Sequence, residues 1–434
     1  MSQLAEHLST QNPHWLSRPV DTGVPRERYL KKIRGYLATE EIIVLNGVRR
    51  SGKTTLLQQT IQDRIDQGSD PKSILFVNCD EPPVQRLADP LAEILEVYQR
   101  EIYGGDQITL IFDEIQAVPG WEKWIKAWYD RKNYQILLSG SSAKLLDSGL
   151  SSKISGRYLK VPVYPLDFTE YLQFHQKSVP HGVIEQAAGK YEILAELRQY
   201  LQYGGFPAPT RIPDEQIRTE HLSTYFDSIL FRDIEEQNDI RNTSVLRKLL
   251  VYAVTNISVP YSYRKLSRMF GVDSRIIADY LAFAEDAFLL FEIQNFSYSL
   301  KSQNISNKKL YAIDSGLRNA VAFRFSADEG RLAENVVYIH LRRNGYNPYF
   351  WKGTGEVDFV VKHRDGALSA INVCLTDDIP EREVRGLAEF SETFGNAVQT
   401  KMIITRDLEK EERGIFYVPL WKWLLGEIVL PGPV

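Results

Sequence analysis

Residues 41–65 read EIIVLNGVRRSGKTTLLQQTIQDRI, an apolar run followed by a short loop and an amphipathic segment. The loop, residues 47–54, has the pattern G-x-x-x-x-G-K-[S/T] between a predicted buried strand and a predicted helix. Gly47 and Gly52 let the backbone wrap around a phosphate group, so that successive N–H groups and the start of the helix point at it. The stretch therefore predicts a nucleotide site on an α/β fold.

The side chains of this loop predict how ATP and Mg²⁺ are held. The Lys53 ammonium is expected to reach the β- and γ-phosphates, and the Thr54 hydroxyl to be a ligand of Mg²⁺. No guanine-reading segment of the NKxD type occurs in the chain, which favours ATP over GTP. The predicted nucleotide-binding residues are Gly47, Arg50, Ser51, Gly52, Lys53, Thr54 and Thr55.

A second candidate site follows the apolar run in ITLIFDEIQ, residues 108–116. Ligands of parallel sheets gather at the carboxyl ends of the strands, where Asp113 and Glu114 are expected to lie. We predict that Asp113 is the second protein partner of Mg²⁺ and that Glu114 is the catalytic base that orients the attacking water. The alternative is a strand that ends in a solvated acidic turn, and the loop at 47–54 argues against it.

Composition places the chain among ordinary globular proteins of the reducing cytoplasm. The 434 residues exceed one typical core, so two or three domains are expected. The net charge of −4 gives no global argument for nucleic acid binding. The two cysteines, Cys79 and Cys374, are far apart in the sequence and lack the spacing of a metal site. Their small number argues against a disulfide framework and favours a cytoplasmic location. No signal peptide or membrane-length apolar run is evident, so no membrane association is expected.

Apolar runs alternate with amphipathic segments through the first part of the chain, which predicts a parallel sheet covered on both faces. The predicted strands are residues 41–46, 73–81, 108–114 and 134–142, and the predicted helices are residues 24–40, the segment after Thr54, 91–104 and 121–132.

Three further residues have two readings each. Ser139 and Ser141 follow the strand QILLSG, where a polar residue can sense the γ-phosphate; either can instead cap a helix over AKLLDSG. Arg157 precedes a short strand, where a guanidinium can stabilise transition-state charge on the nucleotide of a neighbouring subunit. A structural salt bridge explains Arg157 equally well. These three residues join Glu114 as candidate catalytic residues.

Four segments together resemble the prokaryotic predicted-ATPase family of the AAA+ class, in its archaeal-ATPase-like branch. They are GVRRSGKT, LIFDEIQ, LLSGSSAKLL and SGRYLKVPVYPLDFTEYL, in this order. The resemblance implies a P-loop ATPase core, a helical lid, a winged helix and a restriction-endonuclease-like end. The expected domains are 1–25, an N-terminal extension; 26–172, the ATPase core; 173–245, the lid; 246–320, the winged helix-turn-helix; and 321–434, the nuclease-like domain.

Residues 263–293 carry the helix-turn-helix resemblance, with Gly271 at the turn and Asp273 or Ser274 capping the second helix. FEIQNFS and KKLYAID are expected to form the wing. The second helix can enter a DNA groove, or the module can pack against the ATPase. Acidic residues on the second helix favour packing, because they would repel phosphates. The basic residues that favour DNA are Arg264, Lys265, Arg268, Lys308 and Lys309.

The nuclease-like end is expected to be degenerate. The resemblance implies Mg²⁺ on Asp358 and on the helical Glu334, with a Glu-x-Lys pair on the next strand. Asn372 and Cys374 stand at the positions of that pair. An amide lacks the charge of a carboxylate, and a thiol cannot replace an ammonium beside developing charge. We therefore expect no cleavage of nucleic acid. A helix is expected around 381–394, and TKMIITRD is expected to be the last strand.

We therefore predict an ATP-binding, Mg²⁺-dependent ATP hydrolase of the AAA+ class whose nucleotide state is coupled to a winged helix and an inactive nuclease-like domain. One alternative is a nucleic-acid-binding module with a slow or regulatory nucleotide site. Another is an interaction scaffold whose nuclease-like end holds a protein partner. Because AAA+ sites are usually completed by a neighbouring subunit, a homo-oligomer is a further expectation.

Overall fold

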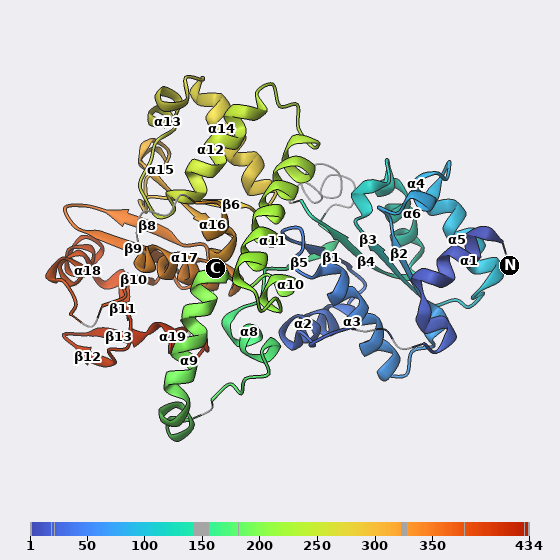
Figure 1. Cartoon of the computed structure of the whole chain (residues 1–434), viewed down its shortest axis with the longest axis horizontal. Coiled ribbons are helices and arrows are strands. Elements are labelled where there is room, and N and C mark those ends of the chain that lie inside the picture. Colours follow the sequence, from blue (N-terminus) through green and yellow to red (C-terminus); the bar gives the residue numbers. More distant parts are fainter. Residues whose placement is uncertain are drawn as a thin grey trace. The chain divides into compact units, whose positions relative to one another are not determined.

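A computed structural model describes residues 2–18, 20, 22–142, 156–180, 182–322, 328–376, 378–428 and 430–432. The chain separates into two compact units, Met1–Val163 and Tyr164–Val434 (Figure 1). The predicted ATPase core, 26–172, extends nine residues past this division. The finer subdivision of the second unit stays a prediction.

The first unit is built on a five-stranded, entirely parallel sheet with the order β2-β3-β4-β1-β5. Alternate residues of a strand point to opposite faces. Val44 accordingly packs in one buried cluster with the helices α1, α5 and α6, whereas Ile43 and Leu45 pack in another with α2 and α3. The predicted parallel sheet with helices on both faces is confirmed.

The elements of the first unit are α1 Gln3–Gln11, η1 Pro13–Leu16, α2 Glu27–Leu37, β1 Ile42–Asn46, α3 Lys53–Asp66, η2 Pro71–Ser73, β2 Ile74–Asn78, α4 Pro82–Gln85, α5 Pro90–Glu101, β3 Ile108–Asp113, η3 Ile115–Ala117, α6 Trp121–Arg131, β4 Tyr134–Gly140 and β5 Tyr158–Pro162. The helix expected over AKLLDSG lies outside the described residues.

The N-terminal segment is an integral part of this unit, although it was predicted as an extension. It covers the edge strand β2 with side-chain hydrogen bonds. Asn12 accepts a bond from the N–H of Phe76 (2.7 Å) and donates one to its carbonyl (2.8 Å). The Trp15 indole donates to the carbonyl of Ile74 (2.8 Å). These bonds satisfy backbone groups that an edge strand otherwise leaves unpaired.

The second unit begins with helices and ends in a mixed sheet. Its elements are α8 Phe168–Phe174, α9 Val183–Tyr203, α10 Pro207–Thr210, α11 Glu215–Ser228, the π-helical stretch η5 Ile229–Glu235, α12 Thr243–Thr255, α13 Tyr263–Phe270, α14 Ser274–Asp286, β6 Leu290–Gln294, α15 Leu300–Ile305, β7 Lys308–Ala312, α16 Ser315–Val321, α17 Glu329–Arg343, β8 Tyr349–Lys352, β9 Glu356–Lys362, β10 Leu368–Cys374, α18 Glu381–Phe394, η6 Gly395–Ala397, β11 Val398–Thr405, β12 Lys410–Glu412, β13 Ile415–Pro419 and α19 Leu420–Leu424.

The mixed sheet has the order β12-β13-β11-β10-β9-β8. The strand β11 runs parallel to both β10 and β13, and the other pairs are antiparallel. The expectation that TKMIITRD forms the last strand was wrong, because β12 and β13 follow it and β13 pairs with it. Those two strands are short, three and five residues, so their pattern is weak in sequence.

The antiparallel hairpin of β6 and β7 adjoins the mixed sheet. The N–H of Phe296, just after β6, donates to the carbonyl of Phe350 in β8 (2.6 Å), and Phe296 belongs to the same buried cluster as Trp351 and Phe390. The hairpin and the C-terminal sheet therefore share one core within the second unit.

Among the described residues, no helix combines the length and apolarity that spanning a membrane requires.

Replacing Asn12 with Ala should destabilise the first unit by about 2–4 kcal/mol, because the buried N–H and C=O of Phe76 lose their partners. Urea unfolding checks the free energy of unfolding, and hydrogen exchange at Phe76 reports the local loss. Thr10→Ala, at an exposed position of the same helix, is the control. Equal stability of the two variants would contradict this role of Asn12.

Candidate functional site

The phosphate loop occupies the carboxyl edge of the parallel sheet, between the end of β1 and the start of α3. Gly52 caps α3 with φ of 95°, and Arg50 also has a positive φ of 67°. At Gly47 packing requires glycine, because a Cβ would lie 2.1 Å from the carbonyl oxygen of Val163. The loop can therefore pack this closely against the residue that follows β5 only because Gly47 has no side chain.

Lys53 lies at the first position of α3, and its ammonium returns over the loop. Its Nζ donates to the carbonyl oxygens of Gly47 (3.0 Å) and Val48 (3.2 Å). The side chain is 3% exposed and its Nζ is 4.0 Å from Oε1 of Glu114. The ammonium is thus placed at the loop, where the β- and γ-phosphates were expected to bind.

Three residues from three elements meet at the end of β3. The Thr54 hydroxyl, in the first turn of α3, donates to Oδ2 of Asp113 at 2.5 Å. The Ser139 hydroxyl, in β4, donates to the other oxygen, Oδ1. Burial raises the pKa of Asp113, whereas the bonds from Ser139 and Thr54 act in the opposite direction. The sequence prediction paired Thr54 with Asp113, and the structure brings Ser139 to the same carboxylate.

Glu114 follows directly, in a left-handed conformation with φ of 49°. Its N–H donates to the Ser139 hydroxyl (3.1 Å), and its Oε2 accepts a bond from Gln116 (2.5 Å). These bonds direct the carboxylate toward the same edge as Lys53. The other oxygen of the carboxylate, Oε1, lies 4.0 Å from the Lys53 ammonium, and the role of Glu114 as a base stays a prediction.

The remaining loop residues differ in exposure. Arg50, Thr54 and Thr55 are exposed, whereas Ser51 is fully buried. Among the described residues, the Ser51 hydroxyl and the side-chain oxygen of Asn46 have no hydrogen-bond partner. Ser141 is also buried, and the helix that it was predicted to cap lies outside the described residues.

The donor set at this edge fits Mg²⁺. The ion prefers hard oxygen ligands and is commonly held by one or two carboxylates or hydroxyls together with substrate phosphates. Thr54 and Asp113 supply one hydroxyl and one carboxylate in direct contact, and Asn46 adds a buried amide oxygen without a described partner at the end of β1.

Arg26 is a residue of the site that the sequence analysis missed. It is 3% exposed, and its guanidinium donates to the carbonyl of Ser51 in the loop (3.0 Å). Its N–H donates to Gln59 of α3 (3.1 Å), whose side-chain amide donates to the carbonyls of Thr22 and Val24 (2.8 Å each). Arg26 precedes the loop by 21 residues outside any motif, so no sequence pattern marked it.

Arg157 lies at the other edge of the sheet. It precedes β5, opposite the start of β1, so roughly 15 Å of strand separates it from the phosphate loop. It forms an exposed ion pair with Asp130 (3.3 Å) and lies over the ring of Tyr129. The salt-bridge alternative is thus observed, and its position separates Arg157 from the loop of its own chain.

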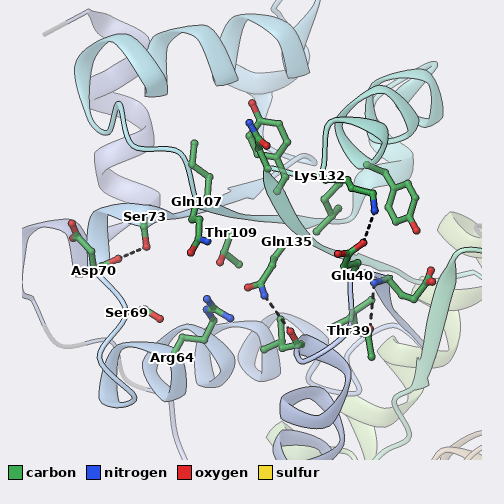
Figure 2. Close-up of a pocket in the computed structure, with 18 of the residues that line it drawn as sticks. Thr39, Glu40, Arg64, Ser69, Asp70, Ser73, Gln107, Thr109, Lys132 and Gln135 are labelled. Carbon is green, nitrogen blue, oxygen red and sulfur yellow. Dashed lines mark hydrogen bonds and ion pairs between the residues drawn. The ribbon is translucent and has the colours of Figure 1, made fainter.

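A cavity of about 410 Å³ also lies at this amino-terminal edge, as Figure 2 shows. Arg64 from α3 points into it, with Gln107 and Gln135 among the residues around it. Lys132 and Glu40 form an ion pair at its side (3.0 Å). The residues that line it do not include the phosphate loop, so this cavity is distinct from the nucleotide site.

Within the second unit, two of the five basic residues that favoured the DNA alternative are buried, Lys308 and Lys309. Lys308 forms an ion pair with Glu292, and Lys309 is buried among carboxylates at 1% exposure. Both side chains point into the protein because their strand, β7, is buried throughout. Arg264, Lys265 and Arg268 are exposed on α13.

Comparison with known proteins identifies the segments of the chain. A family model described as an AAA domain matches residues 39–172. Two models described as domains of unknown function match later segments, DUF8612 at residues 194–328 and DUF4143 at residues 329–423. The first unit therefore contains an AAA domain around the phosphate loop.

Two similar proteins align with nearly the whole chain. The uncharacterized protein MJ1544 of Methanocaldococcus jannaschii is 33% identical over 410 residues, which cover 90% of this chain and 89% of that protein. An uncharacterized protein of Haemophilus influenzae is 29% identical, with 93% and 98% covered. Among solved structures, the Walker-type ATPase PABY2304 of Pyrococcus abyssi aligns with a TM-score of 0.46 at 15% identity, covering 68% of this chain and 95% of that one.

Replacing Arg26 with Met should lower nucleotide affinity by up to about tenfold, because the loop loses a charge-assisted hydrogen bond that supports it from inside the protein. Calorimetric titration with an ATP analogue measures the affinity. Lys31→Met, an exposed position on the same helix, should leave affinity unchanged. If Arg26→Met binds nucleotide as the unmodified protein does, the contact to Ser51 has no positioning role.

Proposed function

We propose that this chain, which belongs to the same protein family as MJ1544, is an ATPase that binds Mg-ATP at residues 47–54 and couples its hydrolysis to the second unit. The observation that carries the proposal is the contact between the Thr54 hydroxyl and Asp113, 2.5 Å apart beside the buried Lys53. A phosphate-binding loop, a cation ligand pair and an ammonium meet at one edge of the sheet.

Each residue has a distinct role in binding. The backbone N–H groups of the loop and the start of α3 bind phosphate oxygens. The Lys53 ammonium exchanges its bonds to the carbonyls of Gly47 and Val48 for bonds to the β- and γ-phosphates. Thr54 and Asp113 would hold Mg²⁺, which would neutralise part of the charge of the phosphates.

Glu114 performs the proton chemistry. Its carboxylate orients the attacking water and accepts its proton, and its bond from Gln116 restricts where that carboxylate points. Ser139 holds the backbone at Glu114 and the side chain of Asp113 at the same time, so it can transmit the state of the nucleotide to the sheet. Arg157 lies at the amino edge of the sheet, so the nucleotide that it is proposed to contact belongs to a neighbouring subunit.

The second unit is proposed to contain a winged helix and a nuclease-like end. The helices α13 and α14, with the left-handed turn at Gly271 and the hairpin β6–β7, match the expected order of a winged helix. The inner face of α14 is buried through Ile277, Tyr280 and Leu281. We favour a packing role for this module over DNA binding, because two of the five expected basic contacts, Lys308 and Lys309, are buried.

Replacing Lys53 with Ala should weaken the binding of an ATP analogue by at least about tenfold, because charge-assisted contacts to the phosphates are lost. Isothermal titration calorimetry measures the dissociation constant. Lys126→Ala, at an exposed position on α6, is the matched control. Unchanged affinity in Lys53→Ala would remove this residue from the nucleotide site.

Replacing Glu114 with Gln should reduce steady-state phosphate release about a hundredfold or more while Mg-ATP still binds, because an amide is a poor base. A coupled phosphate assay and a binding titration on the same preparation separate the two effects. Glu96→Gln, an exposed change on α5, should behave as the unmodified protein. Turnover at the parent rate in Glu114→Gln would exclude Glu114 as the base.

A further inference from the structure

A buried lysine lies at the centre of a carboxylate cluster in the second unit. The Nζ of Lys309, on β7, is 2.8 Å from Oε1 of Glu356, 3.2 Å from Oε1 of Glu334 and 3.5 Å from Oδ1 of Asp358. Its side chain is 1% exposed. Two of these carboxylates come from β9 and the third from α17, so one ammonium joins three elements.

The carboxylates are held in place by further bonds. The Tyr311 hydroxyl donates to Oε1 of Glu334 (2.6 Å). Oδ2 of Asp358 accepts the N–H of Val373 on β10 (2.9 Å), and the N–H of Asp358 donates to the Asn372 side chain (3.1 Å). The cluster is therefore organised by its own surroundings, independently of any bound ion.

The residues do not fit the Mg²⁺ site that the nuclease resemblance implies. Oε1 of Glu334 and Oδ1 of Asp358 face the Lys309 nitrogen, so a divalent cation would compete with the ammonium for these oxygens. The Asn372 amide group donates to Glu383 (3.0 Å) and its oxygen accepts the backbone N–H of Asp358, whereas Cys374 contacts Thr376. In the described part of the chain, neither side chain bonds a carboxylate group of Glu334, Glu356 or Asp358. In the part of the chain that the structure describes, no group of three or more His, Cys, Asp or Glu side chains is arranged to hold a metal.

The ammonium of this cluster comes from another position than the resemblance implies. The resemblance puts a lysine at position 374, where the chain has the thiol of Cys374. The structure brings the ammonium from Lys309, 65 residues earlier in the chain, because the β6–β7 hairpin adjoins the C-terminal sheet. Burial by itself would lower the pKa of Lys309, but Glu334, Asp358 and Glu356 together raise it above its ordinary value, so the lysine stays charged.

The cluster carries more negative than positive charge. Burial raises the pKa of Glu334 to about 7, and the neighbouring Asp358 contributes in the same direction. Two carboxylates also reach toward solvent, with 16% of the Asp358 side chain and 32% of the Glu356 side chain exposed. The cluster would thus attract a cation from solution if its own ammonium were removed.

We propose that Lys309 is the resident cation of this cluster and takes the position that a divalent metal ion would otherwise occupy. The second unit then needs no metal to hold α17, β7 and β9 together, and the cluster performs no metal-dependent cleavage of nucleic acid. Replacing the ammonium with a neutral side chain converts Glu334, Glu356 and Asp358 into a site for a divalent cation. The proposal is independent of the nucleotide site, because its test uses no ATP.

The experiment titrates Mn²⁺ into the full-length protein and into Lys309→Met, following free Mn²⁺ by electron paramagnetic resonance. The variant is expected to bind one Mn²⁺ ion more than the unmodified protein does, with an affinity at least about tenfold higher than any further Mn²⁺ binding by the unmodified protein. Adding Asp358→Asn to the variant should remove that ion. Lys308→Met, the neighbouring position on the same strand, should gain no site.

Two further arms keep the result decisive if Lys309→Met folds poorly. Lys309→Met with Glu334→Gln removes a negative charge along with the ammonium and should still gain a site that depends on Asp358. In the unmodified protein, Asp358→Asn should leave Mn²⁺ binding unchanged. The proposal is overturned if Asp358→Asn abolishes Mn²⁺ binding by the unmodified protein, if folded Lys309 variants gain no site, or if the unmodified protein cleaves plasmid DNA with Mn²⁺ and Asp358→Asn does not.

Discussion

The order of three parallel strands, β3-β4-β1, is the constraint on which the nucleotide site depends. Because β4 lies between the other two, its Ser139 sits beside Leu45 at the end of β1 and next to Asp113 at the end of β3. Parallel pairing puts all three carboxyl ends on one edge. The loop, the carboxylates and the hydroxyls then meet without any long side chain having to reach across the sheet.

The two units stabilise buried carboxylates in different ways. Asp113 is 2% exposed and is surrounded by the hydroxyls of Thr54 and Ser139, which donate hydrogen bonds but carry no charge. In the proposed function, Mg²⁺ that binds with ATP would supply the positive charge that these hydroxyls lack. The cluster around Lys309 contains its own cation on a rigid strand. Burying a charge without a partner is costly, and in the second unit the Lys309 ammonium offsets that cost from within the chain.

Elements outside the motifs hold the first unit in shape. Asn12 pairs with the exposed edge of β2, and Arg26 supports the phosphate loop from within the protein. Both side chains bond backbone carbonyl or amide groups, which every sequence has, so these contacts leave no motif in the sequence. Such contacts explain why a segment that reads as an extension belongs physically to the ATPase unit.

The sequence by itself determined the parallel sheet, the phosphate loop and the expectation that Thr54 and Asp113 share a site. These predictions depend on local patterns, because the apolar run of a strand and a loop bounded by glycines are both visible in consecutive residues. Only the tertiary structure decided where Arg26, Ser139, Arg157 and Lys309 lie and what they contact. Ser139 could not be separated from a helix cap by pattern alone, and Arg157 lies at the edge away from its own loop. The sequence pattern indicated a basic surface residue at Lys309, but in the structure its side chain lies among three carboxylates. The partners of a buried charge depend on packing between segments that are distant in sequence.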